Sequence, residues 1–130
     1  MFGRALQLEM SLDLAVVTLT EQLERSGFTV LAGYDQQAMT SEAAPAVWLS
    51  LWHGKLGSEA VRICPDAAVL GVLTAVVRRD HGTGQTHVRL PDPATLLMLS
   101  DCPAMNAVSE SLTRLIDQAM VSTLMADTPS

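Results

Sequence analysis

The chain has 130 residues, of which 48% are hydrophobic and 17% charged, and its 8 basic and 14 acidic residues give a net charge of −6. This length fits one domain with a single core, and the apolar fraction excludes an intrinsically disordered segment. The acidic balance argues against a nucleic-acid surface. Charged or polar residues interrupt every hydrophobic run before the roughly 18 residues of a membrane helix, and the first residues lack a secretion signal. We therefore expect a cytoplasmic protein that contacts neither nucleic acid nor membrane.

The first half of the chain predicts one strand, one helix and two further strands. Residues 2–10 alternate in polarity, which is typical of a strand with one dry face. Ser11 is suited to cap a helix whose apolar residues recur with helical spacing until Gly27. Segments 28–34 and 46–52 predict strands, and a polar stretch separates them.

The second half predicts a short helix, a hairpin and two C-terminal helices. Residues 55–63 fit a short helix, and segments 73–79 and 85–90 fit two antiparallel strands joined by a glycine-containing turn. Residues 94–99 form a short helical segment. The strongest periodicity in the chain lies in the stretch 100–126, where apolar residues recur every three or four positions and predict a long amphipathic helix.

The element order β-α-β-β-α-β-β, followed by helices, predicts an α+β fold. We expect a single, mostly antiparallel five-stranded sheet with helices on one face and an added C-terminal helix. A ferredoxin-like β-α-β-β-α-β core with extra elements is the alternative, since it shares the first six elements. Residues 1–99 form the α+β domain in this interpretation, residues 100–126 a helix that packs on the same domain or on a partner, and residues 127–130 a frayed tail.

Four sequence features carry a family resemblance. They are, in chain order, Arg25-Ser26-Gly27-Phe28-Thr29-Val30-Leu31, His53-Gly54-Lys55-Leu56-Gly57, Arg78-Arg79-Asp80 and Leu90-Pro91-Asp92-Pro93. Over residues 1 to about 99 the chain resembles the domain of unknown function 302 family, with Gly54 and Gly71 standing where that family commonly has prolines. The resemblance implies a small α+β domain that forms homodimers and has no established biochemical activity.

The turn between the strand 46–52 and the following helix is the candidate ligand site. Its residues are Trp52, His53, Gly54, Lys55, Gly57 and Ser58. Free amide groups and the helix dipole at such a turn can hold a small anion with help from Lys55. The turn is not a P-loop, because Ser58 and not lysine follows Gly57. The alternative interpretation is a tight strand-to-helix turn without a ligand.

Histidines and cysteines raise two further hypotheses, a metal site and a reactive thiol. The three histidines and two cysteines lack the spacing of metal ligands on one helix, so we expect no metal and no cofactor. A thiol-dependent enzyme, or a redox or metal-handling protein, would combine Cys102 or Cys64 with a histidine such as His53, His81 or His87. Because the spacing identifies no nucleophile, base and orienting group, we favour a non-catalytic protein and keep the thiol enzyme as the alternative.

The strand 46–52 is hydrophobic on both of its faces. Its aliphatic residues point one way and Trp48 and Trp52 the other, so helices on the aliphatic side would leave two indoles uncovered. We expect a homodimer whose interface includes Trp48, Trp52, Leu112, Leu115 and Ala119. In the alternative, the C-terminal helix folds back over the indoles. The sequence thus predicts a dimeric, non-catalytic ligand-binding or accessory module.

Overall fold

A computed structural model of the chain describes residues 3–40 and 44–127. The elements are, in chain order, β1 (Gly3–Leu8), α1 (Leu12–Arg25), β2 (Phe28–Asp35), α2 (Gln36–Met39), β3 (Ala46–His53), α3 (Gly54–Ile63), the 3-10 turn η1 (Ala68–Gly71), β4 (Leu73–Arg79), β5 (Thr86–Pro91), α4 (Pro93–Met98), the 3-10 turn η2 (Pro103–Met105) and α5 (Asn106–Ala126). The predicted strands and longer helices are all present, with ends that differ by a few residues.

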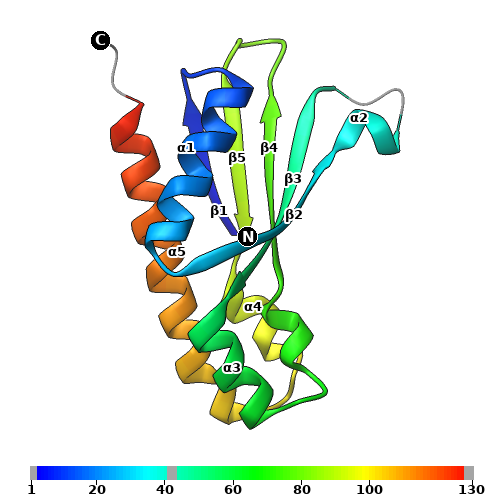
Figure 1. The fold of residues 1–130 in the computed structure, drawn as a ribbon, viewed down its shortest axis with the longest axis vertical. Helices are drawn as coiled ribbons and strands as arrows, with labels where there is room; N and C mark the ends of the chain where they lie inside the picture. Colours follow the sequence, from blue (N-terminus) through cyan, green and yellow to red (C-terminus); the bar gives the residue numbers. More distant parts are fainter. Residues whose placement is uncertain (1–2, 41–43, 128–130) are drawn as a thin grey trace.

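The five strands form one antiparallel sheet in the order β1-β5-β4-β3-β2 (Figure 1). The α+β prediction is therefore confirmed. The ferredoxin-like alternative is wrong, because in that fold a single strand separates the two strands of a β-α-β unit, whereas three strands separate β1 from β2 here. Helix α1 consequently carries the chain from one edge of the sheet to the other.

The two faces of the sheet differ in composition because side chains alternate along each strand. In β4, Leu73, Ala75 and Val77 are buried, whereas Thr74 and Arg78 are exposed. Helices α1 and α5 contact each other and supply apolar residues to the core that includes these buried strand residues. The opposite face, called the open face below, carries Trp48 and lies away from α1 and α5. The shorter helices reach only its margins, α2 at Trp48, α3 at Trp52 and α4 at one end of β4.

Helix α5 packs on its own chain, on the aliphatic side of the sheet. Leu112 and Ala119 are buried there, and Leu115 is partly buried against the same core. The alternative in which this helix covers the indoles is therefore wrong, and Leu112 and Ala119 are core residues. Within the described residues, no helix has the combined length and hydropathy needed to span a bilayer.

Polar side chains cap the start of α1 and fix the end of α5. The Ser11 side chain accepts a hydrogen bond from the Leu14 N–H, as the sequence predicts. At the other end of the chain, the Asp127 carboxylate accepts hydrogen bonds from the backbone N–H groups of Glu9 and Met10, at 2.7 and 3.0 Å. The predicted frayed tail is therefore wrong at Asp127, and residues 128–130 lie outside the described residues.

Helix α2 lies in the polar stretch that the sequence indicated only as a connection. The Asp35 side chain accepts a hydrogen bond from the Gln37 N–H, which starts the helix. Gln36 then bridges to β3, because its side-chain oxygen accepts a hydrogen bond of 2.9 Å from the Trp48 indole N–H. A helix of four residues is too short to show an apolar periodicity, so the sequence pattern does not predict it.

The two glycines of α3 provide a matched test of close packing. A Cβ atom on Gly57 would overlap the indole of Trp52, whereas a Cβ on Gly54 would meet nothing within 4 Å. We expect Gly57→Ala to lower the free energy of unfolding by about 1–3 kcal/mol despite its better helix propensity. Gly54→Ala should raise it by up to about 1 kcal/mol. Urea denaturation measures both, and a Gly57→Ala protein as stable as Gly54→Ala would contradict the packing argument.

Candidate functional site

His53, the central residue of the predicted ligand turn, links three segments of the chain. Its Nδ1 accepts a hydrogen bond from the Leu56 N–H at 3.1 Å and so caps α3. With Nδ1 as an acceptor, the neutral ring carries its proton on Nε2, which donates to the Ser26 carbonyl oxygen at 3.1 Å. The ring also makes an edge contact with Phe28. Both ring nitrogens are thus engaged, and only 8% of the residue is exposed.

The other residues of the turn also stabilise α3. Trp52 packs its indole against Gly57, and the Ser58 hydroxyl donates a 2.7 Å hydrogen bond to the Gly54 carbonyl oxygen. Lys55 is exposed and makes no ion pair among the described residues. The structure therefore brings the six predicted residues together as a strand-to-helix turn, in which Lys55 is the cationic side chain left for an anion.

The contacts of His53 predict a stability effect. His53→Ala removes the cap of α3 and the hydrogen bond to the Ser26 carbonyl, so it should cost at least about 2 kcal/mol of unfolding free energy. His53→Asn keeps a capping oxygen and should lose about half as much. His81→Ala, in the exposed β4–β5 turn, is the control. Equal stability of His53→Ala and His81→Ala in urea titrations would refute this role.

The cysteines and histidines lie in separate parts of the fold. Cys64 ends α3 while His53 caps its start, which places their backbones about 16 Å apart at 1.5 Å per residue. Cys102 precedes η2. Both thiols are free, and neither sulfur bonds to a histidine in the described part of the chain. Among those residues, no group of three or more histidine, cysteine or acidic side chains is arranged to hold a metal ion.

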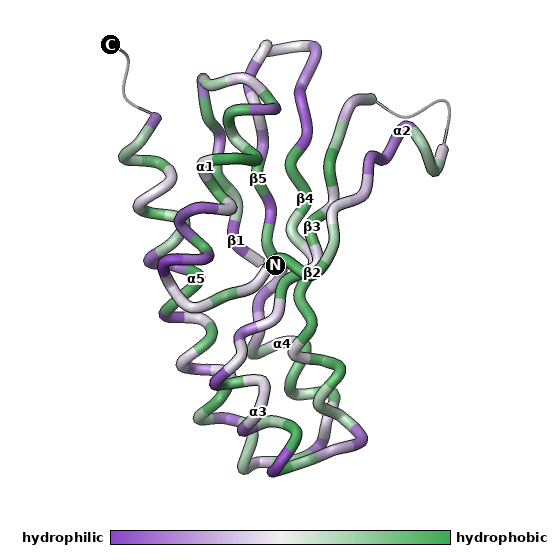
Figure 2. Tube along the Cα trace, in the orientation of Figure 1, coloured by the Kyte–Doolittle hydropathy of each residue, from purple (hydrophilic) through white to green (hydrophobic). Residues whose placement is uncertain are grey.

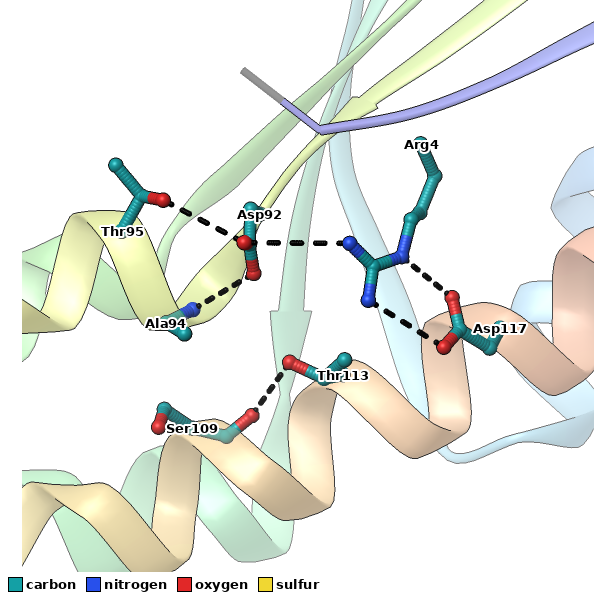
Figure 3. Close-up of polar contacts among 7 residues, drawn as sticks. All are labelled: Arg4, Asp92, Ala94, Thr95, Ser109, Thr113 and Asp117. Atoms are coloured by element: carbon teal, nitrogen blue, oxygen red, sulfur yellow. Dashed lines mark hydrogen bonds and ion pairs between the residues drawn. The ribbon is translucent and has the colours of Figure 1, made fainter. Parts of the chain in front are cut away.

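A polar cluster joins β1 to α4 and α5 (Figure 3). The Arg4 guanidinium donates to Asp117 at 2.7 Å and lies 3.9 Å from Asp92, the residue that caps α4. The hydrogen bond to Asp117 raises the pKa of Arg4 above its ordinary value. Arg4 borders a groove of about 760 Å³ beside α5. Because Arg4 already pairs with two carboxylates, we interpret this cluster as a structural link between β1, α4 and α5.

The open face carries an apolar row across three strands. Tyr34, Trp48 and Val76 are direct cross-strand neighbours on β2, β3 and β4. Tyr34 is 47% exposed, and Trp48 and Val76 are half-buried. A bulge at Leu31 interrupts the β2–β3 register and places Tyr34 opposite Trp48. This row, called the aromatic row below, is the hydrophobic part of the face that the tryptophan alternation predicted.

Next to the aromatic row, the open face carries three basic side chains. Arg78 lies directly opposite His87, and Arg89 lies directly opposite Val76. Direct neighbours in antiparallel strands have Cβ atoms about 5 Å apart and diagonal neighbours about 7–8 Å apart. Arg78, His87 and Arg89, called the basic cluster below, therefore surround one small area. Gln7 and Ala5 of β1 complete its border.

Asp80 closes the β4–β5 turn beside the basic cluster. Its carboxylate accepts hydrogen bonds from the Gly82 N–H at 3.0 Å and the Thr83 hydroxyl at 3.2 Å, and lies 3.4 Å from His87 Nε2. The hydrogen bond from the Gly82 N–H contributes most to lowering the pKa of Asp80 below its ordinary value. Burial opposes it, and Thr83, His87 and Arg78 add smaller lowering effects. The turn is therefore held by an ionised carboxylate.

The lowered pKa of Asp80 predicts a pH-dependent contribution to stability. A carboxylate whose pKa is lower in the folded state stabilises above its unfolded pKa, about 4, and loses this effect as the pH falls through the folded value. Asp80→Asn should therefore lower the melting temperature at pH 7, and the difference from wild type should shrink towards pH 3. Asp66→Asn, at an exposed position, is the control. A difference that stays constant with pH would contradict this role of the charge.

The sequence pattern did not indicate the basic cluster as a site. The sequence predicts the strands 73–79 and 85–90. Their alternation puts Arg78 on the same face of its strand as Val76, and His87 on the same face as Arg89. The register that sets Arg78 opposite His87 depends on how the two strands pair, which the glycine-containing turn did not define.

Comparisons with known proteins agree with this fold. A family model described as Domain of unknown function DUF302 matches residues 4–123, and so extends past residue 99, where the resemblance in sequence ended, through most of α5. The chain is also similar to the crystal structure of an uncharacterized conserved DUF302 protein from Bacillus stearothermophilus, with a TM-score of 0.85 and 17% sequence identity. That alignment covers 95% of this chain and 98% of the other.

At such an identity the likeness shows a shared fold. No curated protein matches the chain. The family model, in contrast, covers most of the sequence and confirms the resemblance carried by the four motifs. The chain therefore belongs to the family named Domain of unknown function DUF302.

Proposed function

We propose that this protein is a non-catalytic binding module that works as a homodimer joined through the open face. The observation that carries this proposal is the aromatic row, which lies on the open face, away from the core helices α1 and α5. Tyrosine and tryptophan are enriched at the centres of protein interfaces. A second copy of the chain is the proposed occupant, because the family resemblance implies homodimers.

A two-fold axis through the open face would let both copies bury the same row. In such an interface each residue of one copy meets a complementary residue of the other, and the two sheets stack face to face. The Trp48 indole is held in place by its hydrogen bond to Gln36. A fixed aromatic side chain loses little conformational entropy on association, which favours it as an anchor. Trp52 is less available, because it packs on Gly57.

The separation of thiols from histidines favours a binding role over the thiol-dependent enzyme. A cysteine nucleophile needs a base within hydrogen-bond reach, and His53 uses both ring nitrogens to hold α1 and α3. His87 lies beside Asp80, near the start of β5.

We also propose that the protein is cytoplasmic. The two free cysteines support this location, because thiols stay reduced there.

Charge on the aromatic row should break the dimer. We expect light scattering to give a dimeric mass for the wild type and a monomeric mass for Tyr34→Glu and Trp48→Glu, because an interface centre does not tolerate an unpaired carboxylate. Tyr34 is the cleaner site, since its side chain is half exposed in the single chain.

Val69→Glu is the matched control, because Val69 is a 67% exposed apolar residue in η1, outside the aromatic row. It should leave the dimer intact, and circular dichroism should show that all three variants are folded. A monomeric wild type would overturn the dimer. Equal dimer dissociation constants for Tyr34→Glu, Val69→Glu and wild type would overturn the proposed interface. Dimer loss in Leu115→Glu alone would move the interface to α5.

A further inference from the structure

We propose that the open face also binds a small organic anion with an apolar chain or ring, held by Arg89 and Arg78 at its charged end and by an adjoining apolar groove. The inference deepens the binding role proposed above and names its ligand class. It does not depend on the homodimer, because every residue of the site comes from one chain.

Arg89 lies where two hollows of the open face meet. One hollow, of about 520 Å³, is bordered by the basic cluster and by Gln7. The other, of about 350 Å³, is called the apolar groove and runs from β4 and β5 to α4. It is lined mainly by Thr74, Val76, Pro91, Leu96 and Leu99. Val76 and Arg89 border both hollows, so together the hollows form one trough that is charged at one end and apolar at the other.

The hydropathy of β4 changes along the same direction. Figure 2 shows hydrophilic residues where β4 and β5 meet at their hairpin, and hydrophobic residues further along β4 towards α4. Leu99 is 72% exposed at the end of α4, where it borders the apolar groove. An exposed leucine beside a half-buried valine offers an apolar ligand more contact area than an isolated surface residue does.

The charges of the trough favour an anion. In a chain with a net charge of −6, two arginines lie diagonally across adjacent strands. Arg89 makes no hydrogen bond or ion pair with any described residue, and Arg78 has Asp80 as its charged neighbour. Like charges at this spacing repel unless a carboxylate or phosphate neutralises them. A guanidinium without an internal partner is free to form a paired hydrogen bond with a carboxylate.

Two acidic side chains at or near the trough already make hydrogen bonds elsewhere. Asp80 accepts hydrogen bonds from Gly82 and Thr83 in its turn. Asp92, at the end of the apolar groove, caps α4 and lies near Arg4. Neither carboxylate makes an ion pair with Arg89, so this guanidinium remains available to the ligand. The size of the apolar groove, near the lower end for ligand pockets, favours a small molecule.

Octanoate tests the proposal, since it combines a carboxylate with an apolar chain. Calorimetric titration should show that octanoate binds more tightly than phosphate, which lacks the chain, and than 1-octanol, which lacks the charge. Arg89→Gln should weaken octanoate binding about tenfold, the expected loss for a charge-assisted hydrogen bond. Leu99→Ser should weaken it about threefold to fivefold through lost apolar contact.

Two matched controls separate the site from general surface effects. Arg62→Gln removes an exposed arginine of α3, and Met98→Ser removes a 74% exposed apolar residue next to Leu99 that does not line the apolar groove. Both should bind octanoate within about twofold of wild type. Amide resonances of β4 and β5 should shift on titration. The proposal is overturned if octanoate does not bind at millimolar concentration or if Arg89→Gln and Arg62→Gln bind alike. Equal binding of octanol or of phosphate also overturns it.

Light scattering on the same samples keeps the two proposals distinguishable. A monomer that binds octanoate with the expected variant pattern supports the site and rejects the dimer. A dimer that shows no octanoate binding supports the dimer and rejects the site. A dimer that binds octanoate in the expected pattern supports both and puts the ligand at the rim of the interface, because Val76 belongs to the aromatic row and to the trough.

Discussion

The fold depends on one constraint, which is that the buried aliphatic side chains of the strands lie on a single side of the sheet. Each strand contributes alternate residues to this dry side, and the two long helices cover it with their own apolar stripes. Burying this surface is the main favourable contribution to folding. Because the two long helices lie on one side, the open face is left without them, and both proposals rest on that asymmetry.

The sequence was sufficient to predict the five strands and the longer helices, because each has its own hydrophobic period and several have local start or stop signals. Ser11 and Gly27, for example, are local signals read within a few residues. Strand order is not local: β1 pairs with β5 through contacts such as Leu6 with Val88, more than eighty residues away. The pattern within β1 does not indicate which strand will lie beside it. The sequence therefore predicted the fold class from the elements but could not exclude the ferredoxin-like strand order.

The candidate ligand turn shows why chemically suggestive residues mislead when their partners are unknown. His53, Gly57 and Trp52 have the chemistry of a binding loop, yet each has a partner within the chain that the sequence does not reveal. Gly27 is one such partner, since a side chain there would contact the His53 ring at 2.6 Å. The sequence named Arg78 only as part of a family motif and did not link it to Arg89, because their proximity depends on strand register.

The position of β1 at the sheet edge has a consequence for synthesis of the protein. β1 precedes its hydrogen-bonding partner β5 by more than seventy residues, and the carboxylate that accepts hydrogen bonds from the Glu9 and Met10 N–H groups belongs to Asp127. During translation β1 therefore stays unpaired, with its backbone groups and apolar side chains accessible, until β5 has left the ribosome. Completion of the sheet thus depends on contacts between segments that lie far apart in the sequence, which form slowly.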